Sequence, residues 1–523
     1  METFDVVIVG AGSAGCVLAA RLSEDRSRRV LLLEAGGADR HLGIRIPAAF
    51  PTLFDSSIDW GFRTAPQRAL EGRAIFWPRG RVLGGSSSLN AMMWIRGFPS
   101  DYESWAKSCG EEWGYSALLP YFQRAEAVEE QIAGPYGREG PLVISEQRDP
   151  NPLTLAFLRA AAECGIPPNT ARNDGPEEGV GLALVNQQRG ARMSAARGYL
   201  RPAHGRSNLV VRTKATATRL ALRRGRVRGV HYLHGGHPRA VSGGVVICAA
   251  GAIGTPKLLL ASGIGPPEEL RALGIEVAVE SHEVGKNLTD HLSAGIALEA
   301  RRPISLAGAR RAAPLLEYLR SRTGLLSSNV AEGYGYIKSA PTEAECDLEL
   351  LFVPAAFVNE GLELPSVHGL TLAAVLLQPD SRGEVRLAST DPAAAPIIDP
   401  RYLSDAAGRD AARLEEGVRR CVELARAPAL AKESGKLIVP EGELTEAVAG
   451  TSVRRYAQTL YHPVGTCRMG SDDSSVVDPS LAVRGTEDLY VADASVMPSI
   501  PHGHTHAPTV AIAERAAELL GGR

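Results

Sequence analysis

Histidines near the C-terminus are the side chains of this chain that are best suited to acid–base chemistry. Tyr461–Gly470 reads YHPVGTCRMG and contains His462, while His502–Thr509 reads HGHTHAPT with three histidines at alternate positions. An imidazole titrates near neutral pH, so it can take a proton from a substrate hydroxyl. Three alternating imidazoles on one strand face are also typical of a metal site. A histidine before a proline is more often a loop residue with a satisfied hydrogen bond, so the residues alone leave these readings open.

The N-terminus carries a strand that runs into a glycine turn. Phe4–Val9 (FDVVIV) is a short apolar run of the kind that is buried on both faces of a parallel sheet. Gly10, Gly12 and Gly15 follow in the spacing GxGxxG, ahead of an alanine-rich helix. In that order they permit a tight turn, a close approach of backbone to a pyrophosphate, and close packing of helix on strand. The free N–H groups of the helix would bind the phosphates.

A second apolar run follows at the expected distance. Arg29–Leu33 (RVLLL) predicts the next strand, and Glu34 at its end is placed to accept hydrogen bonds from ribose hydroxyls. Strand, turn, helix, strand and acid in this order predict a dinucleotide site, although the spacing does not separate FAD from NAD. No second GxGxxG occurs, so no separate nicotinamide domain is indicated if the dinucleotide is FAD.

Size and composition exclude several classes of protein. A chain of 523 residues predicts two joined domains, and a formal net charge of -2 without a long basic run argues against nucleic acid as the main partner. Seven cysteines without a CxxC pair favour a reducing compartment. No apolar run approaches the ~20 residues of a membrane span, and a strand beginning at Phe4 leaves no room for a signal peptide. We therefore expect a cytoplasmic protein without stable membrane insertion.

The middle of the chain supplies further elements that would position a ligand. Gly80–Asn90 (GRVLGGSSSLN) predicts a loop that passes close to a ligand, the alternative being a serine-rich surface loop. Gly244–Ala249 predicts another buried strand, and Ala250–Gly265 predicts a glycine turn, a short helix and a second turn. Ser207–Ala217 and Arg226–Tyr232 predict antiparallel strands joined by a charged turn.

The expected fold class is α/β (α+β overall), with a Rossmann-like dinucleotide domain interleaved with a second domain of antiparallel sheet and helices. Helical and strand-like patterns of the second domain include Asp410–Ala425, Leu348–Val353 and Leu370–Leu377. The expected dinucleotide-binding domain comprises residues 1–155, 206–299 and 453–523, and the expected substrate domain comprises residues 156–205 and 300–452.

These motifs together resemble the glucose-methanol-choline (GMC) oxidoreductases over nearly the whole chain. The matching phrases are the N-terminal fingerprint, GRVLGGSSSLN, GAIGTPKLLLASGIG (Gly251–Gly265), VGKNLTDHL (Val284–Leu292) and HPVGTCRMG. The resemblance, which includes choline dehydrogenase-like members, implies an FAD enzyme that oxidises a small-molecule alcohol, a CH–OH donor, to an aldehyde or ketone. A hydride would pass to flavin N5 and a histidine would take the hydroxyl proton. The electron acceptor would be oxygen or quinone-like, and no metal is implied.

The resemblance also assigns roles to individual residues. His462 corresponds to the catalytic base, and His504 to a second catalytic position that is His or Asn in the family. Relatives often read NTNAPT where this chain has HTHAPT, so His506 is the alternative to His504. Leu89 stands where some members attach FAD covalently through a histidine, which implies non-covalent FAD. Glu332 stands where choline-specific members place a carboxylate for the substrate cation, and other members carry the same acid.

The cofactor site implied in this way combines the fingerprint with later segments. Its residues are Gly10, Gly12, Ser13, Ala14, Gly15, Glu34, Ala35, Arg81, Gly84, Gly85, Ser86, Asn90, Ala91, Met92, Ala215, Asp493, Ala494, His504, Thr505 and Pro508. His462, His504 and Glu332 are the candidates for substrate contact.

Two other activities on the same fold remain alternatives: hydroxynitrile cleavage without net redox, and light-driven decarboxylation of a fatty acid. The motifs do not identify the alcohol, and they do not separate oxygen from other acceptors.

Overall fold

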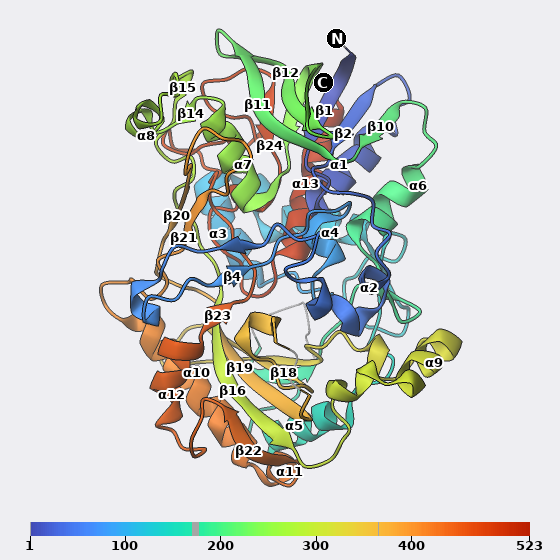
Figure 1. The fold of residues 1–523 in the computed structure, drawn as a ribbon, viewed down its shortest axis with the longest axis vertical. Coiled ribbons are helices and arrows are strands. Elements are labelled where there is room, and N and C mark those ends of the chain that lie inside the picture. Colours follow the sequence, from blue (N-terminus) through green and yellow to red (C-terminus); the bar gives the residue numbers. More distant parts are fainter. Residues whose placement is uncertain (1, 170–176, 364–365, 523) are drawn as a thin grey trace.

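The computed structural model describes residues 2–169, 177–363 and 366–522. Two sheets lie one above the other along the long axis of the molecule, and both chain termini lie beside the upper sheet (Figure 1). None of the helices in the described ranges is both long enough and apolar enough to cross a membrane.

The upper sheet is mostly parallel and has the order β10-β2-β1-β13-β12-β11, with β24 paired to β13. Its strands are β1 (Thr3–Val9), β2 (Val30–Leu33), β10 (Leu209–Arg212), β11 (Ala215–Arg223), β12 (Arg226–His234), β13 (His237–Cys248) and β24 (Leu489–Val491). β1 pairs in parallel with both β2 and β13, and its last four residues are buried. The predicted strands at Phe4–Val9 and Arg29–Leu33 are therefore confirmed to within one residue.

Helices that follow the strands cover this sheet and begin near its carboxyl edge. They are α1 (Ser13–Leu22), α7 (Gly251–Ala261) and α13 (His506–Gly521). α1 and α13 pack against each other, so the first and the last helix of the chain are neighbours. Alanine and glycine in α1 allow this close packing, and the predicted final helix at Ala507–Leu520 is confirmed.

The lower sheet is antiparallel and has the order β22-β16-β19-β18-β17-β7, with β23 paired to β16. Its strands are β7 (Gly179–Leu182), β16 (Leu292–Ala300), β17 (Gly333–Ile337), β18 (Leu348–Val353), β19 (Gly369–Leu376), β22 (Ser434–Val439) and β23 (Gln458–Thr459). Helices α5 (Pro152–Glu163) and α10 (Arg409–Arg426) pack on it through a shared hydrophobic cluster. The predicted patterns for α10, β18 and β19 are thus confirmed.

Some boundaries differ from the expectation. Ser207–Ala217 does not form one strand, because Lys214 adopts φ +54° and separates β10, which is parallel to β2, from β11, which pairs with β12. β16 belongs to the lower sheet although residues 206–299 were expected in the upper domain. The turn at Ala196–Leu200 contacts α1 although residues 156–205 were expected in the lower domain. Each segment belongs to the domain that contains its hydrogen-bonding or packing partners, and local sequence patterns do not show which partners these are.

Candidate active site

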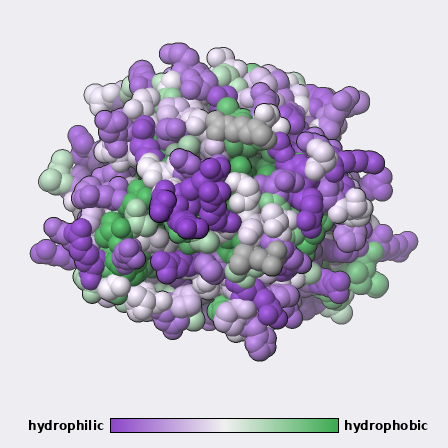
Figure 2. Space-filling view, turned by 90° about the horizontal axis from the view of Figure 1, so that it is seen from above, coloured by the Kyte–Doolittle hydropathy of each residue, from purple (hydrophilic) through white to green (hydrophobic). Residues whose placement is uncertain are grey.

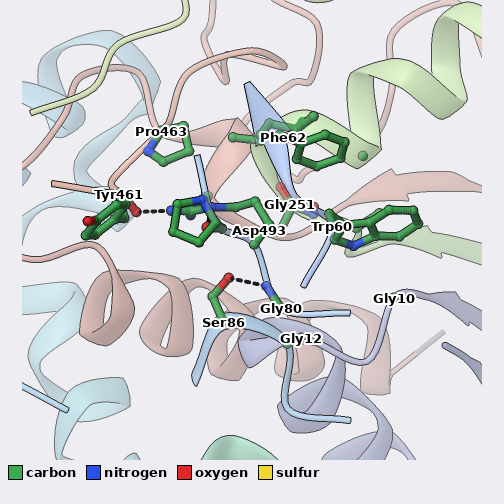
Figure 3. Close-up of a pocket in the computed structure, with 18 of the residues that line it drawn as sticks. Gly10, Gly12, Trp60, Phe62, Gly80, Ser86, Gly251, Tyr461, Pro463 and Asp493 are labelled. Atoms are coloured by element: carbon green, nitrogen blue, oxygen red, sulfur yellow. Dashed lines mark hydrogen bonds between the residues drawn. The ribbon is translucent and has the colours of Figure 1, made fainter. Parts of the chain in front are cut away.

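A cavity of about 830 Å³ lies between the two sheets and is lined by residues of both. This volume is in the upper part of the ~300–1,000 Å³ range of small-molecule and cofactor sites. Figure 3 shows how Gly10 and Gly12 of the first turn, Gly251 of α7 and Asp493 after β24 surround the same space. The ends of parallel strands β1, β13 and β24 therefore converge on it, as expected for a ligand site in an open α/β sheet.

Backbone packing explains why glycines occur around this cavity. Gly10 has φ +99°, and a Cβ there would lie 2.5 Å from the carbonyl oxygen of Ala249. A Cβ on Gly85 would lie 2.6 Å from Cα of Gly12, so the Gly80–Asn90 loop touches the first turn directly. In contrast, a Cβ on Gly12 would meet nothing within 4 Å, and Gly12 lines the cavity. The backbone at Gly12 is thus open to a ligand that approaches it closely.

Three helices begin at the cavity wall. Ser13 starts α1, Gly251 starts α7 and His506 starts α13, and all three residues line the cavity. The first N–H groups of a helix lack intrahelical acceptors, and the helix dipole adds positive potential there. The cavity therefore suits a ligand with negative charge at more than one position.

Two buried carboxylates hold the cavity walls together. Glu34 accepts hydrogen bonds from the backbone N–H groups of Ala11 and Gly36, both at 2.8 Å. Its burial raises the pKa of Glu34 to about 7. Asp493 accepts from the N–H of Gly251 at 2.8 Å, and its burial also raises its pKa. Each carboxylate thus joins two chain segments and still lies on the cavity surface.

His462 belongs to a chain of hydrogen bonds that defines its tautomer. The Nδ1 atoms of His462 and His291 are 3.0 Å apart, and Nε2 of His291 lies 3.0 Å from the carbonyl oxygen of Leu377. A carbonyl can only accept, so Nε2 of His291 carries its proton and Nδ1 of a neutral His291 is the acceptor. His462 must then donate from Nδ1, which leaves its Nε2 with a free lone pair. This is the form that a proton acceptor requires.

Burial keeps the imidazole rings of His291 and His462 neutral. It lowers the pKa of His291 from its ordinary value of 6.5 to about 3, with a smaller contribution from His504. The pKa of His462 also lies well below 6.5, because of burial first and then the electrostatic influence of the neighbouring His504, His291 and Arg79 side chains. Since a lowered histidine pKa favours the neutral form above it, both rings are neutral at neutral pH and His462 can accept a proton.

The backbone of His462 is held by the residue next to His291. Asp290 accepts from the N–H of His462 at 2.7 Å and from Oγ1 of Thr459 at 2.6 Å. The hydroxyl of Tyr402 donates to the same carboxylate. Asp290 and His291 are adjacent in sequence, so one short segment positions both the backbone and the ring of His462.

The three alternating histidines have three different partners. His504 lies beside His462, with ring centroids 4.7 Å apart, and its Nε2 is 3.1 Å from Oε1 of the buried Glu349. Nδ1 of His502 is 2.6 Å from Asp101, and Nδ1 of His506 is 3.0 Å from Oγ of Ser13. Because each ring is directed to its own partner, this arrangement does not favour the hypothesis of a shared metal site. His504, and not His506, is the ring that lies against His462.

The cavity brings together most of the residues expected at a cofactor site. Lining it are Gly10, Gly12, Ser13, Ala14, Glu34, Ala35, Gly85, Ser86, Asn90, Ala91, Met92, Ala215, His462, Asp493, Ala494, His504 and Thr505. Gly15, Arg81, Gly84 and Pro508 are outside this lining. A Cβ on Gly15 would lie 1.8 Å from the carbonyl oxygen of Gly10, so Gly15 serves helix packing. The Arg81 guanidinium lies 5.0 Å from the ring centroid of Trp60.

The position of Glu332 does not favour the substrate contact that we expected for it. Its carboxylate accepts from the hydroxyls of Thr154 at 2.5 Å and Ser328 at 2.6 Å, and from the N–H of Asn151 at 2.8 Å. Its neighbours Val330 and Ala331 line the cavity but Glu332 does not. The carboxylate of Glu332 therefore links the start of α5 to β17, which begins at the next residue, Gly333.

Several residues at the site were not found by sequence reasoning. Asp290, His291 and Glu349 hold the two candidate catalytic rings. The partly buried Arg79 donates to the carbonyl of Tyr461 at 2.7 Å. The phrase VGKNLTDHL contains the first two, so a signal existed. Only the fold brings Glu349 of β18 to His504, 155 positions away.

The fold and the cavity define an α/β protein with a dinucleotide-type site at the carboxyl ends of its parallel strands. Residues 4–293 and 379–513 match the family described as GMC oxidoreductase. The chain is 42% identical to an alcohol dehydrogenase (acceptor) of Pseudomonas putida, covering 99% of this chain and 95% of the relative. It is 39% identical to the mitochondrial choline dehydrogenase of Homo sapiens, covering 100% and 90%. The crystal structure of pyridoxine 4-oxidase from Mesorbium loti superposes with a TM-score of 0.90 at 34% identity, covering 99% of both chains.

This chain therefore belongs to the GMC oxidoreductase family, whose relatives include choline dehydrogenase and alcohol dehydrogenase. The residues of the cavity fit FAD, because they combine the open backbone at Gly12, helix N-termini at Ser13 and Gly251, and an acid at Glu34. These are the groups that a dinucleotide requires.

Proposed function

We propose that this protein oxidises the alcohol group of a small molecule to an aldehyde or ketone with non-covalently bound FAD. The observation that carries the proposal is the hydrogen-bonded chain from Leu377 through His291 to His462. This chain of bonds supports a neutral His462 with an unprotonated Nε2, and His462 lines the cavity in which we propose that FAD binds. The names of the relatives, an alcohol dehydrogenase and choline dehydrogenase, support the same class of substrate.

Residues of the upper sheet would hold the cofactor. The turn at Gly10–Gly12 and the N-terminus of α1 would bind the pyrophosphate, and Glu34 would bind the ribose. The N-terminus of α13, together with Asn90, Ala91 and Met92, would lie against the flavin by family resemblance. FAD, when bound, would supply the hydride acceptor.

His462 would act as the base. Its Nε2 would take the hydroxyl proton as the substrate carbon loses hydride, and Asp290 and His291 would hold the ring in place. His504 would orient the substrate oxygen. Glu349 would hold the ring of His504 in place through its Nε2. The electron acceptor would be oxygen or a quinone-like compound.

A panel of alcohols mixed anaerobically with the enzyme tests this function. Bleaching of the flavin absorbance by an alcohol is expected, with formation of the matching aldehyde or ketone. Parallel assays with oxygen and with a dye acceptor would identify the acceptor. Absence of bleaching, combined with cyanide release from hydroxynitriles or with decarboxylation only in light, would refute the proposal.

The attachment of FAD gives a separate prediction. Leu89 lines the cavity at the position of the linking histidine in some relatives, and a leucine side chain has no nucleophile. Acid precipitation of the purified enzyme is therefore expected to release yellow flavin into the supernatant. Flavin that stays with the protein pellet would contradict non-covalent binding.

Substrate preference is expected to favour neutral alcohols over choline. Glu332 is held by Thr154, Ser328 and Asn151, and does not line the cavity. Aliphatic side chains such as Val330, Leu351 and Val353 do line it. We expect a neutral alcohol with an apolar body to have the highest kcat/KM. Choline exceeding every neutral alcohol by a wide margin would overturn this prediction.

A further inference from the structure

Helix α9 (Ala312–Ser321) carries a hydrophobic face that no part of the described chain covers. Leu315, Leu316 and Leu319 are 43%, 69% and 60% exposed. With Ala312 they occupy positions i, i+3, i+4 and i+7, which is the pattern of one helix face. Such a stripe normally faces a core, yet here it faces outward.

Seen from above, the molecule is largely hydrophilic, and hydrophobic side chains are found there only in separated groups (Figure 2). α9 lies at the outer edge of the lower part and projects from it (Figure 1). An exposed apolar stripe on a projecting element is typical of an interaction site.

The opposite side of α9 is anchored firmly. Tyr318 is fully buried, and its hydroxyl donates to the carbonyl oxygens of Gly190 at 2.9 Å and Arg45 at 3.3 Å. Arg45 ends helix α2 (Leu42–Arg45), whose first residue, Leu42, is 78% exposed. The leucine face is thus presented by a helix whose buried side is held by hydrogen bonds.

Positive charge surrounds the leucine face. Arg310, Arg311 and Arg322 flank α9, and Arg320 lies in its last turn. All four are exposed, and none forms an ion pair with a residue in the described ranges. Glu317 is the one acid on the helix. A second group lies nearby, since Arg45, Arg201 and Arg322 all help to lower the pKa of Arg197, after burial as the largest cause.

We propose that α9 and its flanking arginines dock this enzyme on the surface of an anionic lipid bilayer. Leucines inserted at the level of the headgroups, with arginines extending to the phosphates, match the amphipathic helices that lie in a membrane interface. A second copy of the chain fits less well, because a symmetric contact through this face would bring the same arginines together. The docking is peripheral and does not require a membrane span.

Sedimentation with vesicles tests the proposal on the purified, FAD-loaded enzyme. Wild type is expected to bind vesicles of phosphatidylcholine with phosphatidylglycerol, and to dissociate from them as the salt concentration is raised. Its affinity for neutral phosphatidylcholine vesicles is expected to be lower by at least about tenfold. The triple variant Leu315→Ser, Leu316→Ser, Leu319→Ser is expected to weaken binding by about tenfold or more. Each exchange of Arg311 or Arg320 for glutamine is expected to weaken it by about fivefold.

The matched control is Val211→Ser on β10, an apolar side chain that is 39% exposed and lies in the upper part of the molecule, away from α9 (Figure 1). It should bind vesicles like wild type. All variants should keep wild-type flavin absorbance and activity on a water-soluble alcohol, because none of the changed residues lines the cavity. Equal binding by the triple variant and wild type, or no binding of wild type to either vesicle, would overturn the proposal. A concentration-dependent dimer that is lost in the triple variant, without vesicle binding, would assign the face to a second copy instead.

Discussion

Replacing His462 with alanine is expected to slow anaerobic flavin reduction by the best alcohol by ~10²–10⁴-fold, because the proposed general base would be lost. Rapid mixing and flavin absorbance would measure the rate. FAD should remain bound, since the proposed phosphate contacts lie at the opposite end of the site around Gly10 and Gly12. The lowered pKa of His462 also predicts that the wild-type rate stays constant as the pH falls from 8 to 6.5, because the ring remains neutral above its pKa.

His504→Asn is the matched comparison for this variant. By family resemblance asparagine is an accepted residue at this position, and its amide can hydrogen-bond to the substrate oxygen, although it cannot take up a proton near neutral pH. Its loss of rate should be smaller than that of His462→Ala. If His504→Asn were inactive while His462→Ala reduced its flavin at nearly the wild-type rate, the two roles would have to be exchanged.

Replacing His291 with leucine is expected to lower the rate of flavin reduction by ~10–100-fold without direct contact to the alcohol, as found for residues that orient a functional imidazole. Leucine removes the acceptor for the Nδ1 proton of His462, so the ring would lose both its orientation and its preferred tautomer. The measurement is the reduction rate as a function of pH, with FAD content and Tm recorded on the same samples.

His291→Asn separates positioning from simple destabilisation. An asparagine oxygen can stand in for Nδ1 as the acceptor, although its amide is too short to reach Leu377 as the imidazole does. We therefore expect partial recovery of the rate, with a Tm no higher than that of His291→Leu. Rates that simply follow Tm in both variants would show that His291 has only a structural role.

Local patterns in the sequence were sufficient to predict the elements at both ends of the chain. Phe4–Val9 and Arg29–Leu33 are continuous apolar runs, and the structure buries them as parallel strands. The spacing of Gly10, Gly12 and Gly15 predicted the turn from the first strand into α1, because the backbone approaches other segments so closely there that few other residues fit. Family motifs added the remaining cavity segments, such as Gly80–Asn90, most of whose expected residues do line the cavity.

The sequence was a poorer guide where contacts are long-range. Lys214 breaks the expected strand at Ser207–Ala217, and its positive φ has no sequence signature. Glu332 was expected at the substrate, but Thr154 and Asn151, which come from a helix far away in the chain, take its carboxylate. Whether a carboxylate faces a cavity or a helix depends on packing that a motif does not record.

The sequence by itself determined the family, the dinucleotide-type turn, and the presence of His462 and His504 in two separate motifs. Only the tertiary structure decided what state these rings are in. It brings His291 to His462 across 171 positions and Glu349 to His504 across 155. The physical reason is that a neutral imidazole has two tautomers, and the partner of one nitrogen determines which nitrogen is free for the substrate. That partner comes from another strand or loop, so it exists only once the two sheets have packed around the cavity.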